Sequence, residues 1–132
     1  MQASLAFYTN GIGFEMTNKW IPDRKIRWCW LQFGGAALML QEFGEKQQLT
    51  KEEKQNLGKG VSIYFICEDA LTIYKETLSR GLSPEEPFVG NNMWVVKFVD
   101  PDGYNIFFVS DTDVAEETMY SDWMKTKLPQ KH

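Results

Sequence analysis

Apolar residues recur at helical spacing over residues 70–82, a pattern that predicts an amphipathic helix. Leu71 and Tyr74 fall on one face of this helix. Asp69 precedes it as a candidate N-cap, and Gly81 is a candidate stop, because glycine readily adopts the backbone conformation that ends helices. The second half of the chain therefore contains one well-delimited predicted helix.

A shorter segment near the N-terminus repeats this pattern. Residues 4–14 open with Ser4, which can cap a helix, and Leu5 and Tyr8 line one face. The same spacing occurs at the start of the helix predicted over residues 70–82. An internal repeat of this kind indicates two similar structural units.

Runs rich in β-branched and aromatic residues predict strands after each helix. These strands are residues 14–21, 26–33 and 36–43 in the first half, and a short piece near 87–89, then 93–99 and 104–110, in the second. The second half has a further predicted strand, residues 61–68, before its helix. A Pro-Asp-Gly turn at residues 101–103 joins the last two strands.

The predicted fold class is α+β, in a single domain over residues 1–132 with two modules that each contain a helix followed by three strands. Module one spans 1–43, a polar linker 44–60, module two 61–111, and an extra C-terminal helix 112–128. That helix is predicted because Ala115, Met119 and Trp123 recur at helical spacing, and a short helical turn is expected around residues 50–56.

The composition of the chain limits the classes of binding partner that are expected. Basic residues are scattered and the formal net charge is −4, so nucleic acid is not an expected partner. No apolar run is long enough to span a bilayer, so no membrane-spanning segment is expected. Cys29 and Cys67 lie in apolar runs outside any CxxC, which predicts reduced thiols in a cytoplasmic protein. The single histidine, His132, is terminal, which disfavours histidine-based catalysis and metal binding.

Several segments in this order resemble the vicinal oxygen chelate superfamily, which includes glyoxalase I, extradiol dioxygenases and bleomycin-resistance proteins. They are the opening SLAFYTNGIGFE, the strand–helix junction VSIYFICED and the hairpin DPDGYNIFF, and the resemblance covers about residues 3–111. It implies tandem βαβββ modules that form a curved mixed sheet around a groove, with each half curling its strands into an incomplete barrel. It also implies that two halves, or two subunits of a homodimer, bring concave faces together around a small-molecule ligand.

The start of the chain departs from this pattern. Aligning the two halves matches Met1 with Cys67, so the strand that precedes the helix in module two has no counterpart in module one. A truncated or misassigned start is the favoured explanation, and adaptation of the half to the loss is the alternative. A missing strand leaves neighbouring edges unpaired, which favours dimerisation or strand exchange.

The superfamily's metal-ligand positions, carried over by the resemblance, fall on Met39, Ser62 and Phe107. A thioether and a hydroxyl are poor ligands for divalent metals, so no cofactor is expected. The resemblance then implies a metal-free protein of the bleomycin-resistance type, which sequesters an amphipathic aromatic or cationic ligand. One alternative is a metal-dependent lyase, isomerase or dioxygenase with donors from the missing strand, from Glu42 or Glu15, or from a second subunit. Another is a regulatory or assembly module without a ligand.

Period-2 alternation along the strands extends the groove lining beyond these three positions. The candidate ligand-binding residues are Trp28, Trp30, Met39, Gln41, Ser62, Tyr64, Trp94, Lys97 and Phe107. Two interpretations remain open for Trp28 and Trp30. Carrying the hairpin register back from Met39 puts both in the core and leaves Arg27 and Cys29 facing the groove. A bulge at the Gly34–Gly35 turn would reverse this and make the indoles a stacking platform.

Overall fold

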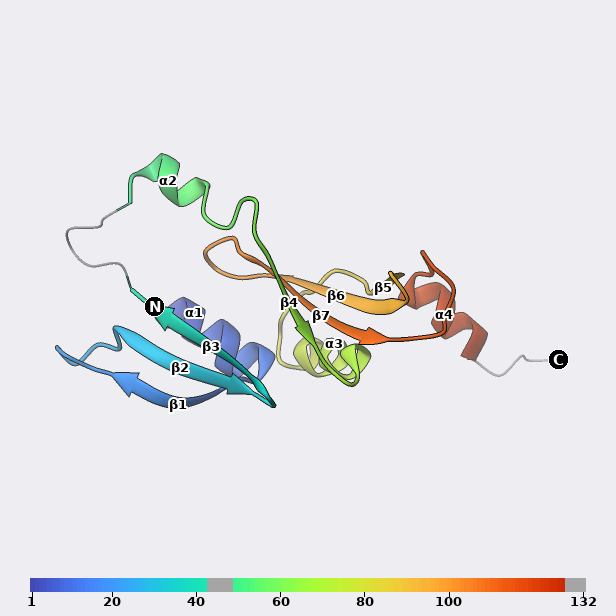
Figure 1. The fold of residues 1–132 in the computed structure, drawn as a ribbon, viewed down its shortest axis with the longest axis horizontal. Helices are drawn as coiled ribbons and strands as arrows, with labels where there is room; N and C mark the ends of the chain where they lie inside the picture. Colours follow the sequence, from blue (N-terminus) through green and yellow to red (C-terminus); the bar gives the residue numbers. More distant parts are fainter. Residues whose placement is uncertain (43–48, 128–132) are drawn as a thin grey trace.

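The chain folds into two separate β-sheets with helices packed on one face of each, as shown in Figure 1. The computed structural model describes residues 1–42 and 49–127. The predicted linker therefore lies partly outside the described residues. Within this part of the chain, no helix is long and apolar enough to cross a membrane.

The first sheet is antiparallel, with the order β1-β2-β3. Its strands are β1 (Glu15–Trp20), β2 (Trp28–Phe33) and β3 (Ala36–Gln41). Gly34 and Gly35 join β2 to β3, and Gly34 has a φ of 56°, which costs glycine little. β1 carries an irregularity between Met16 and Asn18.

The second sheet is mixed, with the order β4-β7-β6-β5. Its strands are β4 (Ser62–Ile66), β5 (Phe88–Gly90), β6 (Met93–Val99) and β7 (Asn105–Asp111), and β4 runs parallel to β7. The predicted turn joins β6 to β7. One carboxylate oxygen of Asp100 accepts hydrogen bonds from the backbone N–H groups of Asp102 and Tyr104, each at 2.9 Å, and Gly103 has a φ of 95°.

The two sheets differ by one strand. In the second sheet β4 pairs with β7, whereas among the described residues no strand pairs with the outer edge of β3. The first module thus has one continuous helical segment, residues 2–12, and three strands, and the second has a strand, a helix and three strands. This arrangement confirms the predicted α+β class and the βαβββ pattern.

The helices are α1 (Gln2–Leu5), the π-helical η1 (Ala6–Ile12), α2 (Lys51–Gln55), α3 (Ala70–Ser79) and α4 (Tyr120–Lys127). All but α4 form where the sequence pattern predicts them. The Asp69 carboxylate accepts a hydrogen bond from the N–H of Thr72, which confirms the predicted N-cap. Gly81, with a φ of 93°, follows the last turn of α3 as predicted.

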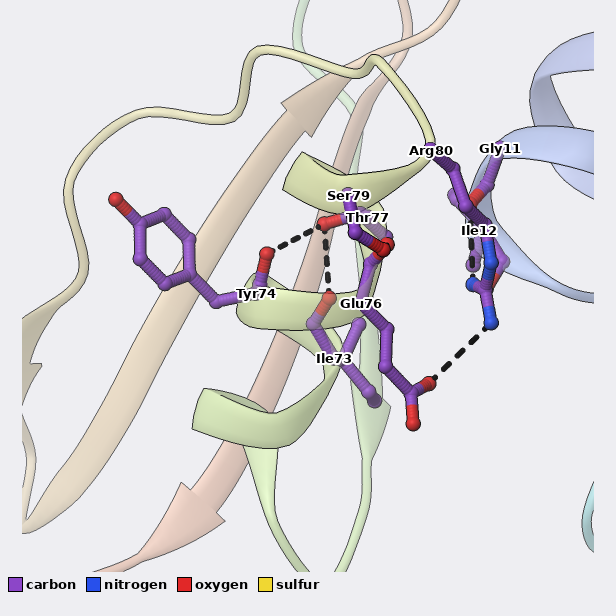
Figure 2. Close-up of polar contacts among 8 residues, drawn as sticks. All are labelled: Gly11, Ile12, Ile73, Tyr74, Glu76, Thr77, Ser79 and Arg80. Carbon is purple, nitrogen blue, oxygen red and sulfur yellow. Dashed lines mark hydrogen bonds and ion pairs between the residues drawn. The ribbon is translucent and has the colours of Figure 1, made fainter.

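Figure 2 shows how α3 is tied to η1. The Arg80 guanidinium donates hydrogen bonds to the carbonyl oxygens of Gly11 at 3.3 Å and Ile12 at 3.0 Å, and it pairs with Glu76 at 3.5 Å. The fully buried hydroxyl of Thr77 donates to the carbonyl of Ile73 one turn earlier. The helices of the two modules therefore pack on each other and join them.

The predicted helix over residues 112–128 is wrong in its first half. Helix α4 begins at Tyr120, and the residues before it run beside β5. The N–H of Val89 donates to the carbonyl of Thr118, and the N–H of Glu117 donates to the carbonyl of Val89. These residues pair with the edge of β5 instead of forming a helical turn, so the tertiary contact overrides the helical spacing. Leu128 lies outside the described residues.

Aromatic side chains from both modules form one shared core. Phe14, just after η1, contacts Phe33 of the first sheet and Phe65 of the second, with ring centroids 5.2 and 5.5 Å apart. Phe33 in turn contacts Phe108 at 5.6 Å. One face of each sheet is thus covered by the other module and by the helices. The opposite faces are more exposed, although Val95 and Val109 on that face of the second sheet are buried.

Candidate functional site

The exposed face of the first sheet carries three indole rings. Trp28 pairs with Gln41 and Trp30 with Met39 across β2 and β3, while Trp20 of β1 pairs with Trp28. Paired residues in an antiparallel sheet project to the same face, so these side chains form one surface. Trp20 is 59% exposed and Met39 58% exposed.

This register decides between the two interpretations of the tryptophans. Because only Gly34 and Gly35 separate the strands, Phe33 lies opposite Ala36, and an even-numbered residue of β2 faces an odd-numbered residue of β3. Trp28 and Trp30 therefore share the face of Met39. The prediction that both indoles lie in the core is therefore wrong. They reach the exposed face without the bulge that the alternative invoked, because the pairing of β2 with β3 is regular.

Cys29 and Arg27 consequently lie on the other side. Cys29 pairs with Leu40 and is fully buried, and burial raises the pKa of its thiol. The Arg27 guanidinium forms an ion pair with Glu42 and holds the pKa of that carboxyl below its usual range. The prediction that Arg27 and Cys29 face the groove is therefore wrong, because the short turn fixes the opposite alternation.

The exposed face of the second sheet holds the other predicted residues. Tyr64, Phe107 and Lys97 form one row across β4, β7 and β6, as shown by their pairing. The rings of Tyr64 and Phe107 are stacked, with centroids 4.4 Å apart and an angle of 9° between their planes. Ser62 lies opposite Asn105 in the next row. Tyr64 is 56% exposed, so the outer part of this stacked pair is open to solvent.

Trp94 lies away from both exposed faces. It pairs with Ser110 and Val89 on the covered face of the second sheet and is only 4% exposed. Its ring contacts Trp123 and Tyr120, with centroids 5.3 and 6.3 Å away. Trp94 and Lys97 are separated by an odd number of steps along β6, so they cannot face the same side. Trp94 is a core residue, so the prediction that it lines the groove is wrong.

The remaining predicted residues form two surfaces. Trp28, Trp30, Met39 and Gln41 belong to the first, and Ser62, Tyr64, Lys97 and Phe107 to the second. Because the covered faces of both sheets contribute rings to the same core, the two surfaces lie on the outside of that core.

Sequence reasoning missed several exposed apolar residues on these faces. Trp20 extends the first surface, and Val99 and Phe88 extend the second, on which the alternation along β4 already placed Ile66, now found to be 85% exposed. Carrying period 2 across to the neighbouring strands would have found them. Contiguous apolar surface of this kind marks binding sites or interfaces in proteins.

A cavity at the junction of the two modules also escaped the sequence analysis. It has a volume of about 240 Å³ and lies along the open edge of β3. Within it, the Tyr8 hydroxyl donates to the second carboxylate oxygen of Asp100 at 2.7 Å. Burial, and then the hydrogen bond to Asp100, raise the pKa of Tyr8 far above its ordinary value. Tyr8 therefore stays protonated and cannot act as a base.

The residues present do not fit the divalent metal of the superfamily's enzymes. Met39, Ser62 and Phe107 offer a thioether, a hydroxyl and a hydrocarbon ring. Over residues 1–42 and 49–127, no group of three or more His, Cys, Asp or Glu side chains is placed to hold a metal. Glu42, an alternative donor, is engaged by Arg27.

Comparison with known proteins establishes the fold. No protein-family model matches the sequence, and no curated protein matches it either. Among solved structures, UcmS2 matches with a TM-score of 0.66 and 18% identity, covering 83% of this chain and 89% of that chain. TnmS3, an antibiotic-binding protein from Streptomyces sp. CB03234, matches with a TM-score of 0.63 and 18% identity, covering 84% and 86%.

A bleomycin resistance determinant encoded on the transposon Tn5 matches with a TM-score of 0.61 and 21% identity, covering 83% of this chain and 88% of that chain. At these identities the likeness concerns the fold. It confirms the resemblance stated from the sequence: the chain has the fold of the glyoxalase and bleomycin-resistance proteins.

Proposed function

We propose that this chain is a metal-free small-molecule binding protein of the bleomycin-resistance type, which holds a flat aromatic ligand on its exposed aromatic faces. The observation that carries the proposal is the open, stacked pair of Tyr64 and Phe107, together with the tryptophan surface on the other sheet. Flat aromatic surface with a few polar groups is typical of small-molecule sites. The metal-ligand positions instead hold Met39, Ser62 and Phe107.

Two copies of the chain complete the site in this proposal. The two surfaces of one chain lie on the outside of its core, so a groove forms when the tryptophan surface of one copy opposes the Tyr64 surface of another. A two-fold axis would form two such grooves at once. The exposed Ile66 and Val99 support the proposal, because exposed apolar side chains of this size gain from burial. The free thiols of Cys29 and Cys67 support a cytoplasmic location.

Replacing Trp30 by alanine is expected to weaken binding of a naphthalene probe, 2-naphthamide, by about tenfold, since an aromatic contact contributes on the order of 1 kcal/mol beyond its buried area. Isothermal titration calorimetry measures this, and EDTA should leave the affinity of the unmodified protein unchanged. Leu78→Ala is the control, because Leu78 is 44% exposed on α3, away from both faces. Unchanged binding by W30A, or loss of binding in EDTA, would contradict the proposal.

Replacing Ile66 by aspartate is expected to convert the dimer into monomers, because the interface would have to bury a carboxylate without a partner. Sedimentation velocity of the variant and the unmodified chain measures the change. Leu78→Asp introduces the same charge outside the proposed interface and should leave the dimer intact. A monomeric unmodified chain would rule out the two-copy site, and so would an I66D variant that still dimerises.

A further inference from the structure

Lys97 is the charged group at the centre of the exposed face of the second sheet. Within the described strands, the other charged side chains on the exposed faces of the two sheets are Glu15 and Asp111, which lie at the ends of their strands. Glu15 is opposite Gln32, and Asp111 is opposite Met93. A ligand lying on the centre of the second sheet therefore meets a cation, and no strand carboxylate lies beside it.

The neighbours of Lys97 make this cation costly to cover. Val95 and Val99 flank it along β6, and Phe107 lies directly opposite it on β7. Its side chain is 30% exposed. A ligand or partner that covers this face removes water from the ammonium group, which is unfavourable unless another charge replaces the water.

Glu85 is the present counter-ion, and it is loosely held. Its carboxylate lies 3.8 Å from the Lys97 ammonium and its side chain is 69% exposed. The N–H of Glu85 donates to the carbonyl of Lys97 at 3.3 Å, so the backbone keeps the two residues together. An exposed ion pair at this separation contributes little, so a ligand anion can take the place of the Glu85 carboxylate.

We propose that the ligand is a planar aromatic anion, such as an aromatic carboxylate, whose ring lies on Tyr64 and Phe107 and whose charge is bound by Lys97. The inference rests on the proposed function and selects the ligand class for that site. The three residues form one row, and neighbouring strands are about 4.8 Å apart. The acid group should therefore be attached to the ring system directly or through a short link.

Three matched probes test the charge that the site selects: 2-naphthoate, neutral 2-naphthamide and 2-naphthylmethylammonium. The unmodified protein is expected to bind 2-naphthoate about tenfold more tightly than the amide, since a charge-assisted hydrogen bond adds to the shared stacking, and to bind the ammonium probe most weakly. In Lys97→Met this preference should disappear, and in Lys97→Arg it should persist. Glu85→Gln should strengthen 2-naphthoate binding, because it removes the competing carboxylate.

Lys75→Met is the control, because Lys75 is an exposed cation on α3 outside both faces, and its loss should leave all three affinities unchanged. Calorimetry separates the two proposals. If 2-naphthoate and the amide bind equally well, or if K97M keeps the preference, the inference is overturned while the aromatic site stands. If none of the three probes binds, both proposals are overturned.

Discussion

Replacing Phe108 by alanine is expected to lower the free energy of unfolding by about 3–5 kcal/mol, the range measured for removing a fully buried phenylalanine ring. Phe108 is fully buried, and its ring lies 5.6 Å from Phe33, 5.1 Å from Phe65 and 5.9 Å from Phe98. Because Phe33 belongs to the first sheet and the others to the second, the cavity would open at the junction of the two modules. Urea unfolding followed by circular dichroism measures the loss.

The neighbouring residue supplies the control. Phe107 is the same residue type on the same strand, but it faces solvent and stacks on Tyr64. F107A is expected to cost about 1 kcal/mol, since it removes one aromatic pair and leaves the core intact. Equal losses for the two variants would show that the assignment of the covered and exposed faces is wrong.

The parts of the fold that the sequence predicted well depend on local chemistry. Strand β6 has the predicted bounds, Met93–Val99, because a run of β-branched and aromatic residues ends at a Pro-Asp-Gly turn. Asp69 and Gly81 delimit α3 as predicted, because an N-cap and a left-handed glycine act within one turn of the helix. These signals need no knowledge of distant residues.

The parts that failed depend on pairing between segments. The side taken by Trp28 and Trp30 follows from the number of residues in the turn after β2, because a change of one residue reverses the alternation. The residues before α4 have helical spacing, but Val89 offers them hydrogen bonds along the edge of β5. Trp94 was misplaced although its odd separation from Lys97 already put it on the opposite face.

The fold and the candidate site carry different kinds of information. The core rings and the Asp100 turn describe a scaffold, and many chemistries occur on one scaffold. What distinguishes this chain is the content of its exposed faces: indoles and a thioether on one, stacked rings and Lys97 on the other. These groups offer stacking and charge pairing, whereas Lewis-acid chemistry would need donors that the same positions lack.

Replacing Asp100 by alanine is the second change expected to be severe, with a loss of more than about 3 kcal/mol in the free energy of unfolding, because hydrogen bonds to a charged group each contribute roughly 1.5–3 kcal/mol. The carboxylate is 7% exposed and accepts hydrogen bonds from the Tyr8 hydroxyl and from the N–H groups of Asp102 and Tyr104. Its removal leaves three donors without their partner, one of them on η1. Thermal and urea unfolding measure the loss.

Two further variants identify the source of that loss. Asp102→Ala removes an exposed carboxylate of the same turn and should cost less than about 1 kcal/mol, since its bond from Ser4 is long, at 3.4 Å. Tyr8→Phe removes only the hydroxyl that reaches Asp100 from the first module. If the hydrogen bond joins the modules, the effects of Y8F and D100A will fall short of additive in the double variant. Additive effects would show instead that Asp100 stabilises the turn alone.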